Sequence, residues 1–286
     1  MTATVQPVSP PAPSIEPPAP PLPPGRAGRL GRAASVLGWA LLGAAVFVAA
    51  WALVCTRTHD LPTPSSAFTS LRTLLAHPFA AKAPYGRGIG LQLLSSLGRV
   101  FKGFVLAAIV GVPLGLGMGA SPRVWKAFNP IVQLLRPVSP LAWFPIALTI
   151  TKSAPQASVW VIFVTALWLV VINTAAGAAN IPHEQLDVSR VFRFGRPAYI
   201  RHVLIPNALP SIVTGLRSAM GIAWMVIVAV EMMSGSSGIG FFVWDSYNAG
   251  KLSFVIAAIV LIGAVGLVLD TLFLKLARKV TLEVRR

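Results

Sequence analysis

The residues of this sequence most suited to chemistry are charged side chains that interrupt long apolar runs. Arg136 lies in one such run, Arg217 and Glu231 lie in another, and Asp270 lies near the end of the last. An arginine at the centre of a bilayer costs about 2.5–3.5 kcal/mol on insertion scales, so Arg136 and Arg217 are expected to face protein or water. A planar guanidinium makes paired hydrogen bonds to a planar oxyanion, which makes Arg136 a candidate anion contact.

Structural roles are the alternative for each of these charges. Arg136 either contacts an anion or reaches the interface and pairs within the fold. Arg217 is a second candidate for the pathway, unless Glu231 or Asp270 neutralises it. Asp270 is alternatively expected to pair with a basic residue of the C-terminal segment. Glu231 suits a structural ion pair or a gate better than contact with an anion.

Small polar and aromatic side chains supplement the charged candidates. Ser139 and Asn173 are polar groups inside apolar runs, suited either to line a pathway or to bridge helices. Trp143 is a further pathway candidate, with packing or interface anchoring as the alternative. Trp244 and Asp245 follow a glycine-rich turn and are candidates for a gate, with an ordinary structured turn as the alternative.

Composition shows what kind of element must position these residues. The 286 residues are 55% hydrophobic and only 11% charged, whereas about a quarter of the residues in an ordinary soluble domain are charged. The net charge of +16 is therefore better explained by loops that face the cytoplasm than by nucleic acid. The sequence has no phosphate-binding loop, no hydrolase or metalloprotease motif and one cysteine, which predicts no enzyme activity, metal site or cofactor in this chain.

Apolar runs of about 20 residues predict an all-α integral membrane protein, because such a helix spans a bilayer core of about 30 Å. Residues 1–32 are rich in proline and are expected to form a disordered cytoplasmic tail. Residues 33–280 are expected to form the transmembrane domain, with its second helix extended at its start by an amphipathic stretch. The predicted spans are 33–56, 93–122, 129–151, 154–180, 207–234 and 252–274.

The distribution of Lys and Arg predicts that both termini face the cytoplasm, which places residues 181–206 on the same side. Pro182 suits a first helical position, and Val188, Val191 and Phe192 would share one face of a short helix. Gly195 is expected to take a left-handed conformation that separates this helix from a second short one.

Residues 181–206 resemble the coupling loop of ABC importer permeases, in which Glu-Ala-Ala is followed by a glycine and then by Ile and Leu-Pro. With the final proline on Pro206, Asp187-Val188-Ser189 falls on the acidic triplet and the expected glycine falls on Arg193. The resemblance assigns coupling to an ATPase to Asp187, Ser189, Arg190, Arg193, Gly195 and Pro206.

Further stretches resemble the nitrate, sulfonate, taurine and bicarbonate group of these permeases. Residues 135–145, which read LRPVSPLAWFP, are similar to the third-span signature and favour the nitrate branch. Ile172-Asn173-Thr174, Gly215-Leu216-Arg217 and the segment from Gly238 to Asp245 are similar to other stretches of the group.

The resemblance implies a type I ABC importer fold with six transmembrane helices and a cytoplasmic coupling helix between spans 4 and 5. It implies a homodimer in a bacterial inner membrane, ATPase subunits that bind ATP in place of this chain, and a periplasmic or lipid-anchored solute-binding protein. The expected substrate is nitrate or nitrite. The alternatives are an alkanesulfonate, taurine, cyanate or bicarbonate, or a different class of protein, a carrier or channel that needs no nucleotide.

Overall fold

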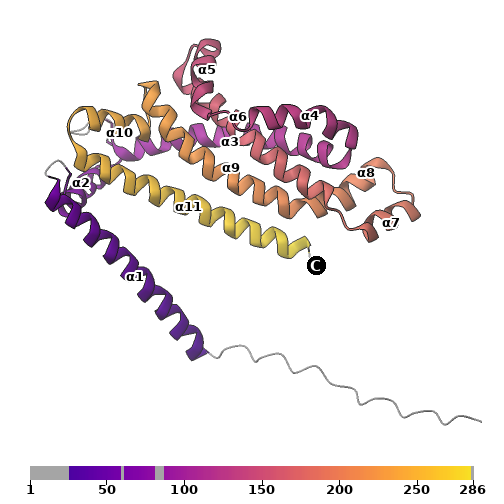
Figure 1. Cartoon of the computed structure of the whole chain (residues 1–286), viewed down its shortest axis with the longest axis horizontal. Coiled ribbons are helices and arrows are strands. Elements are labelled where there is room, and N and C mark those ends of the chain that lie inside the picture. The colour runs from indigo at the N-terminus through magenta and orange to yellow at the C-terminus, as the bar shows by residue number, and fades with distance from the viewer. Residues whose placement is uncertain (1–25, 59–60, 81–86, 285–286) are drawn as a thin grey trace, which may run out of the picture. The chain divides into compact units, whose positions relative to one another are not determined.

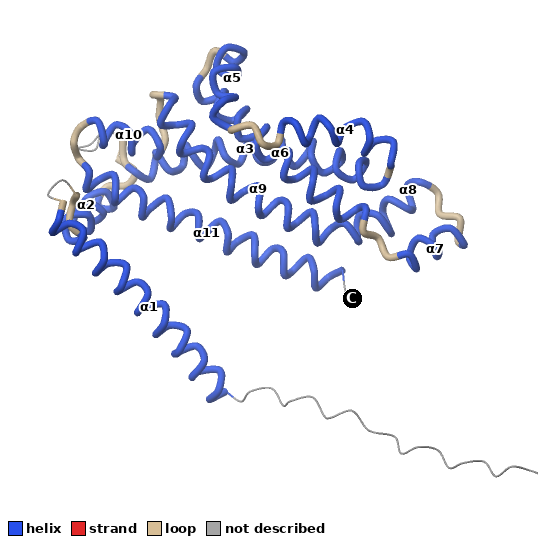
Figure 2. Tube along the Cα trace, viewed as in Figure 1, coloured by secondary structure: helices blue, strands red, loops and turns tan. Residues whose placement is uncertain are grey.

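The part of the chain that the structure describes consists of helices joined by short loops and contains no strand, which confirms the predicted all-α class (Figures 1 and 2). A computed structural model describes residues 26–58, 61–80 and 87–284. The α-helices are α1 (Arg26–Arg57), α2 (Pro64–Ala76), α3 (Ile89–Ala120), α4 (Pro122–Leu135), α5 (Phe144–Thr151), α6 (Ala154–Ala179), α7 (His183–Val191), α8 (Arg196–Tyr199), α9 (Ile205–Ser234), α10 (Ile239–Asn248) and α11 (Leu252–Val284). A 3₁₀-helix, η1, covers Pro140–Trp143, and a π-helix, η2, covers Ile200–Leu204.

The chain divides into two units, one ending at Val54 and the other starting at Cys55. Within the first unit, α1 begins at Arg26, so residues 26–32 are helical although they were expected to belong to the tail. The expected disorder of residues 1–25 lies outside the described residues. The stretch Gly38–Arg57 is long and apolar enough to cross a membrane.

The second unit is built on four long helices, α3, α6, α9 and α11. The helix α3 packs along α6, α6 packs along α9, and α9 packs along α11. The core between them is made of buried aliphatic and aromatic side chains such as Val100, Ile162, Val170 and Ile227. The short helices α7 and α8 lie at the opposite end of this unit from α10 (Figure 1).

Small residues bring α3 and α6 close together, because Gly111, Gly115 and Gly119 share the face of α3 that contacts α6. A Cβ atom on Gly115 would lie 2.6 Å from Cβ of Thr174 and 2.7 Å from the carbonyl oxygen of Val171. Contacts this short leave no room for a methyl group, so these glycines set the distance between the two helices.

We expect Gly115→Ala to destabilise the folded protein, because the added methyl group overlaps α6 and overpacking typically costs about 1–3 kcal/mol. Gly117→Ala is the matched control, since a Cβ there would meet its nearest atom, Cγ1 of Val124, at 3.8 Å. The midpoint temperature of aggregation of the purified protein measures the difference. Equal midpoints for the two variants would contradict close packing at Gly115.

The span predicted for residues 129–151 is not one straight helix. The helix α4 ends at Leu135, and the helical segment from Pro140 to Thr151 continues at 97° to it. Two prolines cause the break, because Pro137 and Pro140 remove backbone donors and a proline restricts the residue before it to extended conformations. By length and composition, five helices can cross a membrane, or six if this bent pair counts as one span.

The helices α3, α6 and α9 begin and end within four residues of the expected ranges, whereas α11 continues to Val284, ten residues beyond the expected end at 274. The helix α3 begins at Ile89 and so includes the amphipathic stretch expected at its start. The second short helix expected after Gly195 is not a separate element. Instead, α8 and η2 run directly into α9, so that residues Arg196–Ser234 form one continuous helical segment. Pro206 lies inside this continuous segment, directly after the π-helical turn η2, so neither it nor Pro197 separates a second short helix from α9.

Candidate functional site

The break after α4 places Arg136 beside two cavities. One cavity, of about 320 Å³, is lined by Arg136 and Trp143 from the break, by Thr165 and Trp168 from α6, and by apolar residues of α9. The other cavity, of about 570 Å³, is lined by Arg136 and by residues of α4 that include Asn129 and Gln133. Arg136 therefore joins a largely apolar cavity to a more polar one.

The smaller cavity lies beside the middle of a membrane-spanning helix. Val164, Thr165, Trp168 and Leu169 line it, and these residues occupy the central turns of α6 (Ala154–Ala179). Among the described residues, no carboxylate lies within ion-pair distance of Arg136. The Arg136 guanidinium, the predicted anion contact, is thus an unneutralised charge beside this cavity.

The other predicted pathway residues lie apart from this cavity, except for Trp143. Ser139 is exposed at the break. Asn173 donates through its side-chain nitrogen to the carbonyl of Leu169, one turn earlier in α6, and its Cβ approaches Gly215 of α9. This arrangement fits the predicted alternative of a small polar residue between helices.

Arg217 forms a structural ion pair with Asp270, one of the two partners weighed for it. The guanidinium makes two parallel hydrogen bonds to the Asp270 carboxylate, of 2.7 Å from Nε and 2.9 Å from Nη2. The pair joins α9 to α11. The alternative pairing of Asp270 with a basic residue of the C-terminal segment is wrong, and Arg217 offers an anion no free charge.

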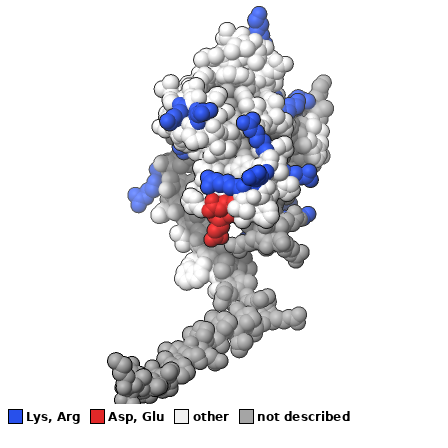
Figure 3. Space-filling model, turned by 90° about the vertical axis from the view of Figure 1, so that its right-hand side faces the viewer, with Lys and Arg blue, Asp and Glu red and all other residues white. Residues whose placement is uncertain are grey.

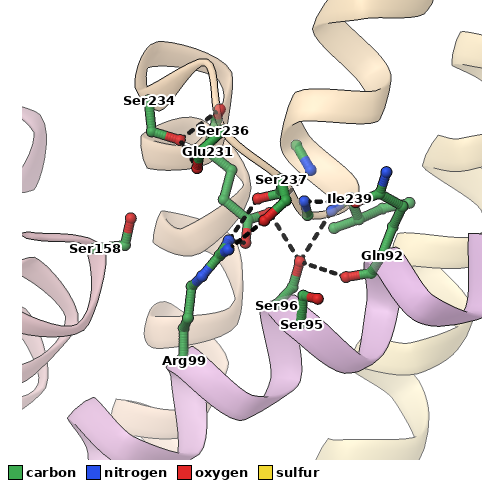
Figure 4. Close-up of polar contacts among 12 residues, drawn as sticks. Gln92, Ser95, Ser96, Arg99, Ser158, Glu231, Ser234, Ser236, Ser237 and Ile239 are labelled. Atoms are coloured by element: carbon green, nitrogen blue, oxygen red, sulfur yellow. Dashed lines mark hydrogen bonds and ion pairs between the residues drawn. The ribbon is translucent and has the colours of Figure 1, made fainter. Parts of the chain in front are cut away.

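Glu231 belongs to a buried polar cluster with Arg99 rather than to a pair with Arg217 (Figure 4). Its fully buried carboxylate accepts hydrogen bonds from Nη1 of Arg99 at 2.6 Å, from Oγ of Ser96 at 2.8 Å and from the backbone N–H of Gly240 at 3.0 Å. Arg99 also donates to the side chain and the carbonyl of Ser237. The cluster holds α3, the end of α9 and the start of α10 together.

A glycine is required where the chain turns around this cluster. Gly238 has φ of +119°, a conformation that residues with a side chain rarely adopt, and any Cβ there would overlap the Glu231 carboxylate. The backbone N–H of Gly238 donates to the side-chain oxygen of Gln92 at 2.7 Å, and that of Ile239 donates to Oγ of Ser96 at 2.9 Å. The free N–H groups at the start of α10 are thereby satisfied by side chains of α3.

Sequence reasoning missed the α3 side of this cluster. Gln92, Ser96 and Arg99 are spaced four and three residues apart, which places them on one face of a helix. That spacing of polar residues within an apolar stretch was the available signal. The nearby gate candidates Trp244 and Asp245 are exposed on α10, where the Trp244 ring stacks on Tyr247 with a centroid distance of 5.8 Å.

The segment predicted to couple to an ATPase contains an exposed helix, α7. Val191 and Phe192 are 78% and 70% exposed. Asp187 and Arg190 form an exposed ion pair of 3.1 Å on the same helix. Ser189 differs from them, because it is buried and donates to the carbonyl of Leu186.

The inner side of α7 is tied to the end of the spanning helices. Leu186 packs against a buried group that includes Ile181, Leu204 and Ala208. The side-chain oxygen of Gln185 accepts a hydrogen bond from Asn207 in the first turn of α9. Pro206 is half-buried in that same turn. A force on α7 would therefore reach α9 through packed side chains.

Basic side chains gather at this end of the unit, which faces the viewer in Figure 3. Exposed arginines and lysines occur on α4, α7, the following turn, α8 and η2, and the acidic area is small. On these elements the exposed basic residues are Arg123, Lys126, Arg190, Arg193, Arg196 and Arg201.

The left-handed residue of this segment is Arg193 and not Gly195. Arg193 has φ of +46°, and its N–H donates to the carbonyl of Arg190 at 3.1 Å. Gly195 has φ of −63° and ψ of 158°, which any residue adopts. The prediction placed the turn at Gly195, the only glycine in the sequence of residues 181–206. The chain turns instead at the position where the coupling-loop pattern has its glycine.

We expect Arg193→Pro to open this turn, because proline cannot take a positive φ and lacks the N–H that donates to Arg190. Gly195→Pro is the matched control, since its φ already suits proline and a Cβ there would meet its nearest atom at 3.9 Å. Amide hydrogen exchange across residues 188–195 should become at least tenfold faster in the first variant only. Unchanged exchange in Arg193→Pro would show that the turn does not depend on this residue.

Comparison with known proteins defines the class of this chain. Residues 107–282 match the family described as the binding-protein-dependent transport system inner membrane component. Because this match covers more than half of the chain, the protein belongs to that family. It is a multi-pass membrane component of a transport system and not an enzyme. Among the described residues, no group of His, Cys, Asp or Glu side chains could hold a metal ion.

Two named relatives come from Synechocystis sp. The nitrate import permease protein NrtB is 42% identical over 79% of this chain and 82% of its own length. The bicarbonate transport system permease protein CmpB is 45% identical over 80% of this chain and 84% of its own length.

The fold has solved counterparts. It is similar to a chain of the MetNI methionine ABC transporter in an inward-facing conformation, with a TM-score of 0.61 and 18% identity over 68% of this chain and 96% of that one. This likeness supports the predicted type I ABC importer permease fold.

Proposed function

We propose that this chain is the permease subunit of an ATP-driven importer of a small oxyanion, with nitrate or nitrite as its substrate. The observation that carries the proposal is the 42% identity to a nitrate import permease over 79% of the chain. The unneutralised Arg136 beside a mid-span cavity supports an anionic substrate. Bicarbonate is the second candidate, because a bicarbonate permease is 45% identical over a similar length.

The experiment is the ATPase rate of the transporter purified with its own ATPase and solute-binding protein. Nitrate at saturating concentration is expected to raise the rate several-fold over chloride. Stimulation by bicarbonate and not by nitrate would make bicarbonate the substrate and would leave the class of transporter unchanged. Stimulation only by taurine, an alkanesulfonate or cyanate would reject both nitrate and bicarbonate.

Residues 181–206 are proposed to couple this chain to the ATPase, with α7 as the docking helix. Val191, the last residue of α7, and Phe192, which follows it, are exposed apolar residues that suit a hydrophobic pocket on a partner. The exposed charges of Asp187, Arg190 and Arg193 suit the rim of that interface, and Ser189, Gly195 and Pro206 shape the segment that carries them. The contacts from α7 to α9 give a route by which closure of the ATPases would move a spanning helix.

The proposed assembly contains two copies of this chain, whose transmembrane domains, residues 33–280, enclose the pathway. Two ATPase subunits would bind ATP on the cytoplasmic side, and a periplasmic or lipid-anchored binding protein would deliver the anion outside. Both termini would face the cytoplasm of a bacterium, because the basic end that carries α7 then lies on the side where Lys and Arg accumulate. The exposed Trp244 and Asp245 are proposed to lie at the outer end, as part of a gate.

A nucleotide-independent carrier or channel is the alternative of a different class. Such a protein would move nitrate across vesicles that contain this chain alone. The proposed permease would not, because its energy comes from partner subunits. Nitrate uptake by vesicles without ATPase subunits would therefore reject the proposal.

A further inference from the structure

One face of α4 carries a row of hydrogen-bond donors. Lys126, Asn129, Gln133 and Arg136 are spaced three, four and three residues apart. At about 100° per residue, the four positions fall within about 80° of arc on one side of the helix. They extend over about 15 Å along its axis, at about 1.5 Å per residue.

None of these four side chains has a hydrogen-bond or ion-pair partner within the part of the chain that the structure describes. Polar groups inside a membrane are normally paired, because lipid offers them no partner. The donors of this row are therefore available to a ligand or to water.

The row leads from the basic end of the unit to the mid-span cavity. Asn129, Gln133 and Arg136 line the cavity of about 570 Å³, and Arg136 also lines the cavity of about 320 Å³ beside the middle of α6. Lys126 lies in the first turns of α4, which starts near α8 (Figure 1). Three members of the row thus line the cavities, and Lys126 continues the row toward the start of α4.

The charges around the row favour an anion. No carboxylate lines either cavity. Among the described spanning helices, Glu231 is held by Arg99 and Asp270 is held by Arg217, so these carboxylates do not offset the positive charge of the row. A small oxyanion needs about twice the ~30 Å³ that a water molecule occupies in the liquid, so both cavities have room for it with part of its hydration shell.

We propose that the α4 donor row, formed by Lys126, Asn129, Gln133 and Arg136, is one wall of the anion pathway and passes an oxyanion from the mid-span cavity to the cytoplasmic end. The inference rests on the proposed function and adds three residues that carry the substrate. Successive weak donor sites about 5 Å apart suit conduction, because an anion must be bound strongly enough to enter and weakly enough to leave.

The test reverses the sign of one added charge at one position. Gln133→Glu and Gln133→Lys each place a charged side chain of similar length on α4, so they share most of the structural cost. Only the glutamate repels an anion. In proteoliposomes that contain the complete transporter, ATP and the binding protein, we expect nitrate uptake by Gln133→Glu to be at least tenfold slower than uptake by Gln133→Lys.

Asn129→Asp and Asn129→Lys repeat the comparison one turn away, which keeps the test decisive if a variant at Gln133 fails to assemble. Equal uptake by the two members of each assembled pair would overturn the inference. Failure of the proposed function is distinguishable, because the unmodified transporter would then take up no nitrate. If, in that case, bicarbonate uptake were slower in the acidic variants than in the basic ones, the donor row would still be part of the pathway and only the substrate would change.

Discussion

Replacing Glu231 with alanine is expected to lower the stability of the folded protein by about 3–5 kcal/mol, the usual cost of removing one partner of a buried ion pair. The variant leaves the guanidinium of Arg99, a residue that is 9% exposed, without its carboxylate. It also removes the shorter of the two acceptor contacts of the Ser96 hydroxyl and the acceptor of the Gly240 N–H. The midpoint temperature of aggregation in detergent, together with the yield of folded protein, measures the loss.

Two further variants test whether the loss of stability arises from the buried cluster. Asp187→Ala removes the carboxylate of an exposed ion pair, whose side chains are 67% and 76% exposed, and should leave the midpoint temperature unchanged. Combining Glu231→Met with Arg99→Met removes both charges and should recover part of the lost stability. A Glu231→Ala protein as stable as the unmodified chain would show that the cluster does not join α3, α9 and α10.

Replacing Phe192 with aspartate is expected to abolish most of the nitrate-stimulated ATPase activity, because a charge would replace an apolar side chain at the end of the proposed docking helix. Truncating a central aromatic residue of an interface commonly costs 2 kcal/mol or more, which is about a thirtyfold loss of affinity. Phe192 is 70% exposed in this chain, so the substitution should leave the permease itself folded. Co-purification with the ATPase measures the affinity.

Phe192→Leu is the matched control, because it keeps an apolar side chain and should retain most of the activity. The permease alone should show the same midpoint temperature in both variants. Normal co-purification and normal stimulation of Phe192→Asp would contradict the assignment of α7 to the ATPase interface.

The membrane-spanning helices were predictable from the sequence because a bilayer demands long apolar runs. Periodicity also predicted the extension at the start of α3. The 97° bend between α4 and the segment after it was not predicted, although Pro137 and Pro140 lie in that stretch of the sequence. Hydropathy shows which residues are apolar and not where a helix changes direction.

The pairing of charges was less accessible to sequence reasoning. Glu231 meets Arg99 across 132 positions of sequence, and Arg217 meets Asp270 across 53 positions. Such pairs depend on which helices become neighbours, which the sequence of a single chain does not specify. The left-handed residue was predicted at Gly195 because glycine adopts that conformation most readily. It lies instead at Arg193, the position at which the coupling-loop pattern has its glycine.

Nitrate uptake into proteoliposomes is the most direct test of the proposed function. Vesicles would contain the purified transporter, its solute-binding protein outside and either ATP or a non-hydrolysable analogue inside with the ATPase subunits. Accumulation of isotopically labelled nitrate above its external concentration with ATP, and none with the analogue, is the predicted result. Equal uptake under both conditions, or uptake by this chain without the ATPase, would contradict an ATP-driven permease.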